Sequence, residues 1–186
     1  TMVTGQNTAA TIAGSANNDT LFGAITSSLN QTISGGAGND AITAGGGSDV
    51  ITGGDGNDTL TPGAGSDNVD GGSGNDTIYG SADEDLLIGG AGDDTYIVTP
   101  DGGADTITEL DGEGSDTIFG GANGLPDQWG YVRTDTAGYE GDFERYEISS
   151  AFDATLNRSY IEVKDLEIPE DVDRLYGIEA LSFRDK

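Results

Sequence analysis

Cysteine and histidine are both absent from this sequence of 186 residues, and only 7 residues are basic against 34 that are acidic. Without these two residue types the chain has no disulfide framework, thiolate nucleophile, zinc-finger site or histidine general base. The formal net charge of −27 argues against nucleic acid or anionic lipid as a partner, because both attract positive charge. We therefore expect an acidic protein that is not an enzyme.

Long apolar runs are absent as well. No stretch approaches the ~20 apolar residues that a membrane-spanning helix needs, and no basic-then-apolar leader opens the sequence. We therefore expect no membrane insertion and no N-terminal signal peptide.

Charge and glycine are unevenly distributed along the chain. Residues 1–132 contain 20 acidic residues and no basic one, whereas residues 133–186 contain 14 acidic residues and all 7 basic ones. Of the 32 glycines, 28 precede residue 125. Carboxylates at this density repel one another, and the few apolar residues offset little of that repulsion by burial. The first part is therefore expected to need bound cations, or some other special arrangement, in order to fold.

A nine-residue repeat runs without interruption from residue 35 to residue 97. Its seven units read GGAGNDAIT, AGGGSDVIT, GGDGNDTLT, PGAGSDNVD, GGSGNDTIY, GSADEDLLI and GGAGDDTYI. Repetition at a fixed period indicates a stacked repeat architecture. Position six is always aspartate: Asp40, Asp49, Asp58, Asp67, Asp76, Asp85 and Asp94. Position eight is always large and mostly aliphatic: Ile42, Ile51, Leu60, Val69, Ile78, Leu87 and Tyr96.

Weaker copies of the unit flank this block. Residues 14–22 keep Asp19, residues 5–13 keep little beyond the opening glycine, and residues 23–34 have three extra residues with Gln31 in place of the aspartate. On the C-terminal side, PDGGADTIT and DGEGSDTIF keep Asp105 and Asp116.

Each unit is interpreted as a turn followed by a very short strand. We expect glycine at positions one, two and four to turn the chain tightly with φ above zero. Positions seven to nine form the strand, and its middle side chain points inward. If each unit is half a coil, turns eighteen residues apart stack ~4.8 Å from one another. One edge then carries Asp40, Asp58, Asp76 and Asp94, and the other carries Asp49, Asp67 and Asp85.

Carboxylates stacked in this way require a cation between them. The available ligands are aspartate oxygens and turn carbonyls, and an all-oxygen, flexible cage favours Ca²⁺. The spacing predicts about five well-formed calcium sites with a few weaker ones. Of the 20 acidic residues before position 133, 10 occupy position six, which favours calcium over the alternative of a halophile's solvated surface.

The units resemble the GGxGxDxUx nonapeptide of RTX (repeats-in-toxin) proteins. The resemblance covers about residues 14–119 and implies an all-β fold, a parallel β-roll (a right-handed β-helix of the RTX type) that binds Ca²⁺ through position-six aspartates and turn carbonyls. Carried onto this sequence, the implied metal residues are Gly35, Gly36, Ala37, Gly38, Asp40, Gly45, Gly46, Gly47, Asp49, Gly53, Gly54, Asp55, Gly56, Asp58, Gly63, Ala64, Gly65, Asp67, Gly71, Gly72, Ser73, Gly74, Asp76, Asp85, Gly89, Gly90, Ala91, Gly92 and Asp94.

Some units depart from the family pattern. Ser81 and Asp83 stand where glycine is expected, so the site that uses Asp85 is expected to be distorted or empty. Ala44 and Pro62 replace the opening glycine, although proline leaves its carbonyl available.

The C-terminal part has a different character. FERYEISS and SYIEVKD are typical of strands joined by a loop near Asn157, and a turn then precedes a short strand over residues 178–183. The expected division is degenerate repeats over 1–34, a β-roll over 35–119, a linker over 120–139 and a β-rich cap over 140–186. Residues 146–148, 163–165 and 178–185 resemble the region after the repeats in type I secreted proteins, which implies a secretion-associated role.

The sequence as a whole predicts a calcium-binding module of a secreted bacterial protein that folds when it meets extracellular Ca²⁺. The type I secretion machinery is its expected partner. Two alternatives remain, a module that binds a polysaccharide or cell surface, and the C-terminal domain of a secreted metalloprotease or lipase. The chain itself contains no H-E-x-x-H helix, no G-x-S-x-G elbow followed by histidine and no EF-hand loop.

Overall fold

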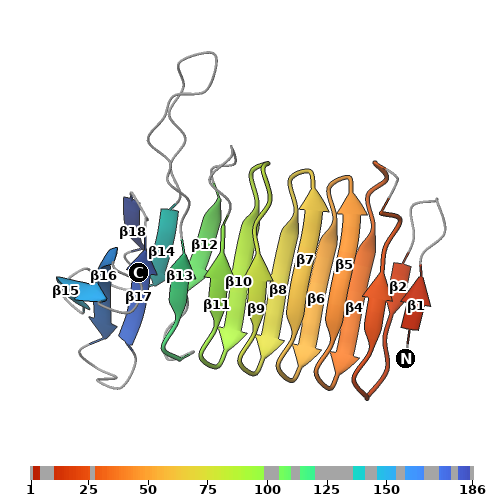
Figure 1. The fold of residues 1–186 in the computed structure, drawn as a ribbon, viewed down its shortest axis with the longest axis horizontal. Coiled ribbons are helices and arrows are strands. Elements are labelled where there is room, and N and C mark those ends of the chain that lie inside the picture. Colours follow the sequence, from red (N-terminus) through yellow and green to blue (C-terminus); the bar gives the residue numbers. More distant parts are fainter. Residues whose placement is uncertain are drawn as a thin grey trace, which may run out of the picture.

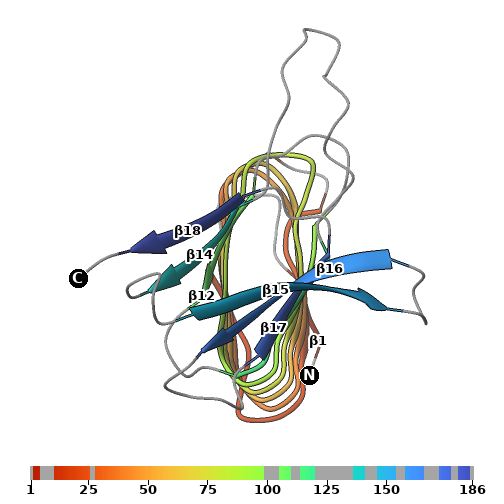
Figure 2. The same ribbon diagram turned by 90° about the vertical axis from the view of Figure 1, so that its left-hand side faces the viewer.

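The chain forms a flattened coil of parallel strands in a computed structural model (Figure 2). The structure describes residues 2–4, 11–25, 28–98, 105–109, 114–119, 136–140, 146–153, 158–165, 172–176 and 180–184. Every regular element among them is a strand, and no helix long and apolar enough to cross a membrane occurs in these ranges.

Two sheets face each other across the coil, and successive strands alternate between them over residues 2–140. The first sheet contains, in spatial order, β1 (Met2–Thr4), β3 (Thr20–Phe22), β5 (Ala41–Gly46), β7 (Thr59–Ala64), β9 (Thr77–Tyr79), β11 (Thr95–Ile97), β13 (Thr117–Phe119), β17 (Val172–Tyr176), β16 (Arg158–Asp165) and β15 (Tyr146–Asp153). The second contains β18 (Ala180–Arg184), β14 (Thr136–Glu140), β12 (Thr106–Glu109), β10 (Leu86–Ala91), β8 (Asn68–Ser73), β6 (Val50–Asp55), β4 (Thr32–Ala37) and β2 (Thr11–Ala13).

The register of the strands follows the nonapeptide. Within the second sheet, Val50 of β6 pairs with Asn68 of β8, and Asn68 pairs with Leu86 of β10, so that each step is eighteen residues. Figure 1 shows these strands side by side along the length of the molecule. The fold is therefore the all-β parallel roll that the period predicts.

Position eight supplies the core. A strand three residues long buries only its middle side chain, as in the exposed–buried–exposed pattern of β2. Leu60, Ile78 and Tyr96 from the first sheet and Ile51 and Leu87 from the second are fully buried in one cluster that follows the axis of the coil. A single unit has one such residue and cannot fold alone, so stability depends on stacking.

The C-terminal strands continue both sheets. β14 and β18 extend the second sheet in parallel, whereas β17 pairs in parallel with β13 and then antiparallel with β16. The two expected strands are β15 and β16, which the structure pairs in antiparallel fashion, and the expected loop near Asn157 lies outside the described residues. The prediction of a turn before residue 178 is wrong for residues 172–176, because β17 occupies them and pairs with strands on both sides.

Candidate metal centre

The position-six aspartates form a continuous ladder along one edge of the coil, called here edge one. Along this ladder, each backbone amide donates to the carboxylate Oδ1 of the next turn. The donor–acceptor pairs are Asp19–Asp40, Asp40–Asp58, Asp58–Asp76, Asp76–Asp94 and Asp94–Asp116, each at 2.7 Å, and then Asp116–Asp173 at 2.8 Å. The expected set of four aspartates on this edge is confirmed, and the ladder continues at both ends.

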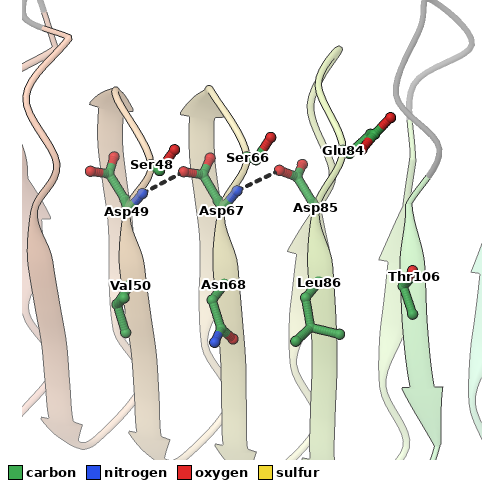
Figure 3. Close-up of a pocket in the computed structure, with 10 residues that line it drawn as sticks. All are labelled: Ser48, Asp49, Val50, Ser66, Asp67, Asn68, Glu84, Asp85, Leu86 and Thr106. Atoms are coloured by element: carbon green, nitrogen blue, oxygen red, sulfur yellow. Dashed lines mark hydrogen bonds between the residues drawn. The ribbon is translucent and has the colours of Figure 1, made fainter.

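The opposite edge, called here edge two, carries a second ladder of the same kind. Its amide-to-carboxylate pairs are Gln31–Asp49 and Asp49–Asp67 at 2.7 Å, Asp67–Asp85 at 2.9 Å and Asp85–Asp105 at 3.0 Å. Figure 3 shows Asp49, Asp67 and Asp85 stacked in this way. The residues on either side of these carboxylates (48–50, 66–68 and 84–86, with Thr106) line an open pocket of about 500 Å³.

Asp173 is a ladder residue that the nine-residue repeat did not predict. It lies 57 residues after Asp116 and outside the phase of the repeat. It is nevertheless buried, and Leu175 two positions later is buried as well. This Asp-x-aliphatic pair is the same combination that marks positions six and eight of the regular units. From this pair, Asp173 could have been predicted as a ladder residue.

In five of the regular turns the second carboxylate oxygen accepts no hydrogen bond. Oδ2 of Asp40, Asp49, Asp58, Asp67 and Asp76 is buried and receives no hydrogen bond. These side chains are at most 4% exposed, so water does not compensate. A buried carboxylate without a counterion is strongly unfavourable, and residues 1–132 contain no lysine or arginine that could supply one. The repeats themselves therefore supply no cationic partner for these oxygens.

Glycine at position one keeps open the space beside this oxygen. A Cβ added to Gly53 would collide with Asp58 Oδ2 and with the carbonyl oxygen of Gly71, and Gly35 and Gly71 face the equivalent pair of atoms. The expectation of a positive φ is wrong at this position and correct at positions two and four, as at Gly54 and Gly56 (both +120°). On edge one, position one therefore requires glycine because carboxylate and carbonyl oxygens converge there.

The last regular turn on edge one has a different lining. Beside Gly89, an added Cβ would meet Asp94 Oδ2 and the hydroxyl of Tyr96. Tyr96 stands at position eight, which supplies core residues in the other units. Its hydroxyl therefore also lies beside the carboxylate oxygen of Asp94.

Burial changes the acidity of these aspartates. Desolvation is the first cause in each case, and it raises the pKa of Asp58 to about 6 and those of Asp67 and Asp76 to about 7. It also raises the pKa of Asp40, Asp49 and Asp85. The accepted amide bonds lower the pKa of each group, but they do not outweigh desolvation. The carboxylates are therefore held where their charged form is disfavoured until a cation neutralises it.

The turn of residues 80–85 differs from the regular turns. Ser81 donates its amide to Asp85 Oδ2 at 2.8 Å, and Asp83 accepts the amide of Gly65 from the preceding turn at 2.8 Å. Asp85 is thus part of the edge-two ladder through Oδ1, but its Oδ2 already accepts the Ser81 amide.

Position five distinguishes the two edges further. On edge one, asparagine side chains form an exposed ladder in which Asn18, Asn39, Asn57 and Asn75 each accept the amide of the following turn at 3.0–3.2 Å. On edge two the corresponding residues are Asn30, Ser48, Ser66 and Glu84, and Ser48 donates its amide to Asn30 at 3.0 Å.

The donor set fits a hard divalent cation. The described residues contain no group of three or more acidic side chains that would hold a metal by themselves. A site between turns must therefore combine aspartate Oδ2 with main-chain carbonyls, and this oxygen-only chemistry is that of Ca²⁺.

Comparison with known proteins supports this interpretation. A search of curated proteins gave no match. The model of the RTX calcium-binding nonapeptide repeat matches in four copies, over residues 4–24, 25–60, 61–96 and 110–123, which together span more than half of the chain. The matched segments include the turns with buried, unpartnered carboxylate oxygens. The chain therefore belongs to the RTX family of calcium-binding nonapeptide-repeat proteins.

Proposed function

We propose that this chain is unfolded inside the bacterial cell and folds outside it when Ca²⁺ binds. Calcium would bind between stacked turns, neutralise the position-six aspartates and convert a self-repelling chain into the roll. The proposal includes no catalytic step. The five buried Oδ2 atoms without a partner carry it, because they make the folded state depend on a ligand that the chain does not contain.

The balance between the extended and the folded chain depends on the calcium concentration. When calcium is scarce, as inside a cell, the net charge of −27 favours an extended chain. When calcium is abundant, a ligand that binds only the folded state stabilises it by RT ln(1 + [Ca²⁺]/Kd) per independent site. Extracellular calcium modules have Kd values of about 10⁻⁴–10⁻³ M, so the transition would occur on leaving the cell.

This behaviour suits passage through a type I secretion channel. An unfolded chain can thread through a channel, and folding outside would oppose its return. The observation that supports this step is the lack of any basic side chain in residues 1–132, which ties folding to the ion. The role in export is testable separately from the folding transition.

The experiment is a calcium titration of the purified chain, followed by far-UV circular dichroism, with Mg²⁺ at equal ionic strength as the control. We expect a cooperative change from coil to β structure in Ca²⁺ only, with a midpoint above the micromolar range. A chain already folded in chelator, or one that responds equally to Mg²⁺, would show that charge screening is sufficient.

A further inference from the structure

Among the described residues, three turns of the coil lack glycine at position two, and all three make the same hydrogen bond. In each, the position-two amide donates to the side-chain oxygen of position six in its own turn. The bonds run from Ser15 to Asp19 Oδ2 (2.6 Å), from Ala24 to Gln31 Oε1 (2.8 Å) and from Ser81 to Asp85 Oδ2 (2.8 Å).

The regular turns show the opposite combination. Position two is glycine with φ between +104° and +138° at Gly36, Gly45, Gly54, Gly63 and Gly72. In the same five turns the position-six Oδ2 is buried and has no partner. The residue at position two and the state of the carboxylate therefore change together.

A physical reason connects the two observations. A residue with a side chain rarely adopts such a φ, so a turn with Ser or Ala at position two takes a different path. On that path the amide hydrogen points at the carboxylate and satisfies it. The amide then removes a ligand from the cage and adds a partial positive charge, and both effects oppose a cation.

We propose that position two decides whether a turn admits calcium, and that the turns of residues 14–19, 23–31 and 80–85 are closed to the ion. This inference rests on the calcium binding of the proposed function and adds where in the roll the ions bind. On edge two the closed turn at Asp85 interrupts the row of calcium sites. On edge one every turn from Asp40 to Asp76 admits the ion.

Asp83 makes the closed turn of residues 80–85 independent of the ion. In open turns the position-four amide donates to a carbonyl of the next turn, as from Gly38 to Asp55 (2.7 Å) and from Gly47 to Ala64 (2.9 Å). At Gly65 the carboxylate of Asp83 accepts this amide instead. The Asp83 side chain thereby links two turns by a hydrogen bond. In the same turn, the Ser81 amide occupies the Asp85 oxygen that a cation would otherwise bind.

The test compares the same substitution on the two edges. Asp58→Asn and Asp85→Asn each keep Oδ1, which accepts the amide of the preceding turn, and each replace Oδ2. Bound calcium per chain is measured by equilibrium dialysis at saturating Ca²⁺, with circular dichroism to verify folding. We expect Asp58→Asn to lose at least one ion and Asp85→Asn to keep the wild-type number.

A second variant tests the cause and keeps the proposal testable if Asp85→Asn fails to fold. Ser81→Gly combined with Asp83→Gly converts the unit to GGAGEDLLI, and we expect it to bind one more ion than the wild type. Ala82→Gly, at the exposed position three of the same turn, is the matched control and leaves the number unchanged.

Two results overturn the proposal. One is an equal loss of calcium in Asp85→Asn and Asp58→Asn, and the other is an unchanged ion count in the double glycine variant. A wild-type chain that binds no calcium at all would instead overturn the proposed function, and this is recognised before any variant is compared.

Discussion

The position-six aspartate makes two different uses of its carboxylate in five turns, those of Asp40, Asp49, Asp58, Asp67 and Asp76. Oδ1 accepts an amide from the neighbouring turn at about 2.7 Å, as Asp58 does from Asp40, and thereby fixes the spacing of the stack. In the open turns Oδ2 is left for an ion. Aspartate thus links neighbouring turns and, in the proposed function, also binds the ion, which accounts for its presence in these five turns.

The raised pKa values of these carboxyls predict how the metal-free chain responds to pH. Asp67 has a pKa of about 7 in the fold against an ordinary value of 3.8. Its protonation therefore favours the fold fully below pH 3.8, and this contribution is lost as the pH rises through about 7. Asp76, with a pKa of about 7, and Asp58, with a pKa of about 6, behave in the same way.

We therefore expect the chain in chelator to contain more β structure at about pH 5 than at about pH 8. Far-UV circular dichroism across this range measures the effect. With calcium present the dependence should reverse, because protons compete with the ion for the same oxygens. Identical chelator spectra at both pH values would contradict the assignment of these carboxyls to a buried, uncompensated state.

At the scale of the elements, the two edges of the coil differ. Edge one combines glycine at position one with an asparagine ladder at position five. Edge two carries Ala44 and Pro62 at position one and serine or glutamate at position five beyond Asn30. Stacking on edge one therefore has a second row of hydrogen bonds, at residues close to the surface.

This difference predicts unequal effects of two similar substitutions. Asn57→Ala removes the acceptor of the Asn75 amide, and since both groups are exposed, water replaces part of the bond. We expect a loss of about 0.5–1 kcal/mol in the free energy of unfolding, measured by chemical denaturation in saturating calcium. Ser66→Ala, the same position on edge two, is the control and should have a smaller effect. Equal losses would contradict a specific role for the asparagine ladder.

At the scale of the whole molecule, the C-terminal strands extend both sheets of the roll. β17 joins the first sheet beside β13, and β14 and β18 extend the second. The amide of Asp116 donates to Asp173 across 57 residues of sequence. The edge-one ladder thus ends on a residue from the C-terminal part, which covers the last strand edge of the repeats.

Removing this connection is expected to weaken calcium-dependent folding. Asp173→Ala leaves the Asp116 amide without its acceptor, at a cost of about 1–3 kcal/mol for a buried donor. The midpoint of the calcium titration should move to higher concentration and the transition should become less steep. Asp173→Asn retains Oδ1 and should shift the midpoint less. A titration of Asp173→Ala that overlays the wild type would show that the two parts fold independently.

The sequence by itself determined the repeat and the architecture that the repeat requires. A period of nine with one large apolar residue per unit requires stacking, and that requirement led to the strand alternation, the core column of Leu60 and its neighbours, and the two aspartate edges. Charge and donor chemistry then indicated calcium, because an acidic repeat without histidine, cysteine or basic residues offers only oxygen ligands.

Other features were decided only by the tertiary structure, because they depend on atoms that come together across turns. Gly53 is required by the approach of Asp58 Oδ2 and a carbonyl eighteen residues away, and not by its own φ. The orientation of the Ser81 amide, which occupies Asp85, is a property of the folded turn. Asp173 belongs to the ladder because β17 pairs with β13, a long-range contact that lies outside the phase of the repeat.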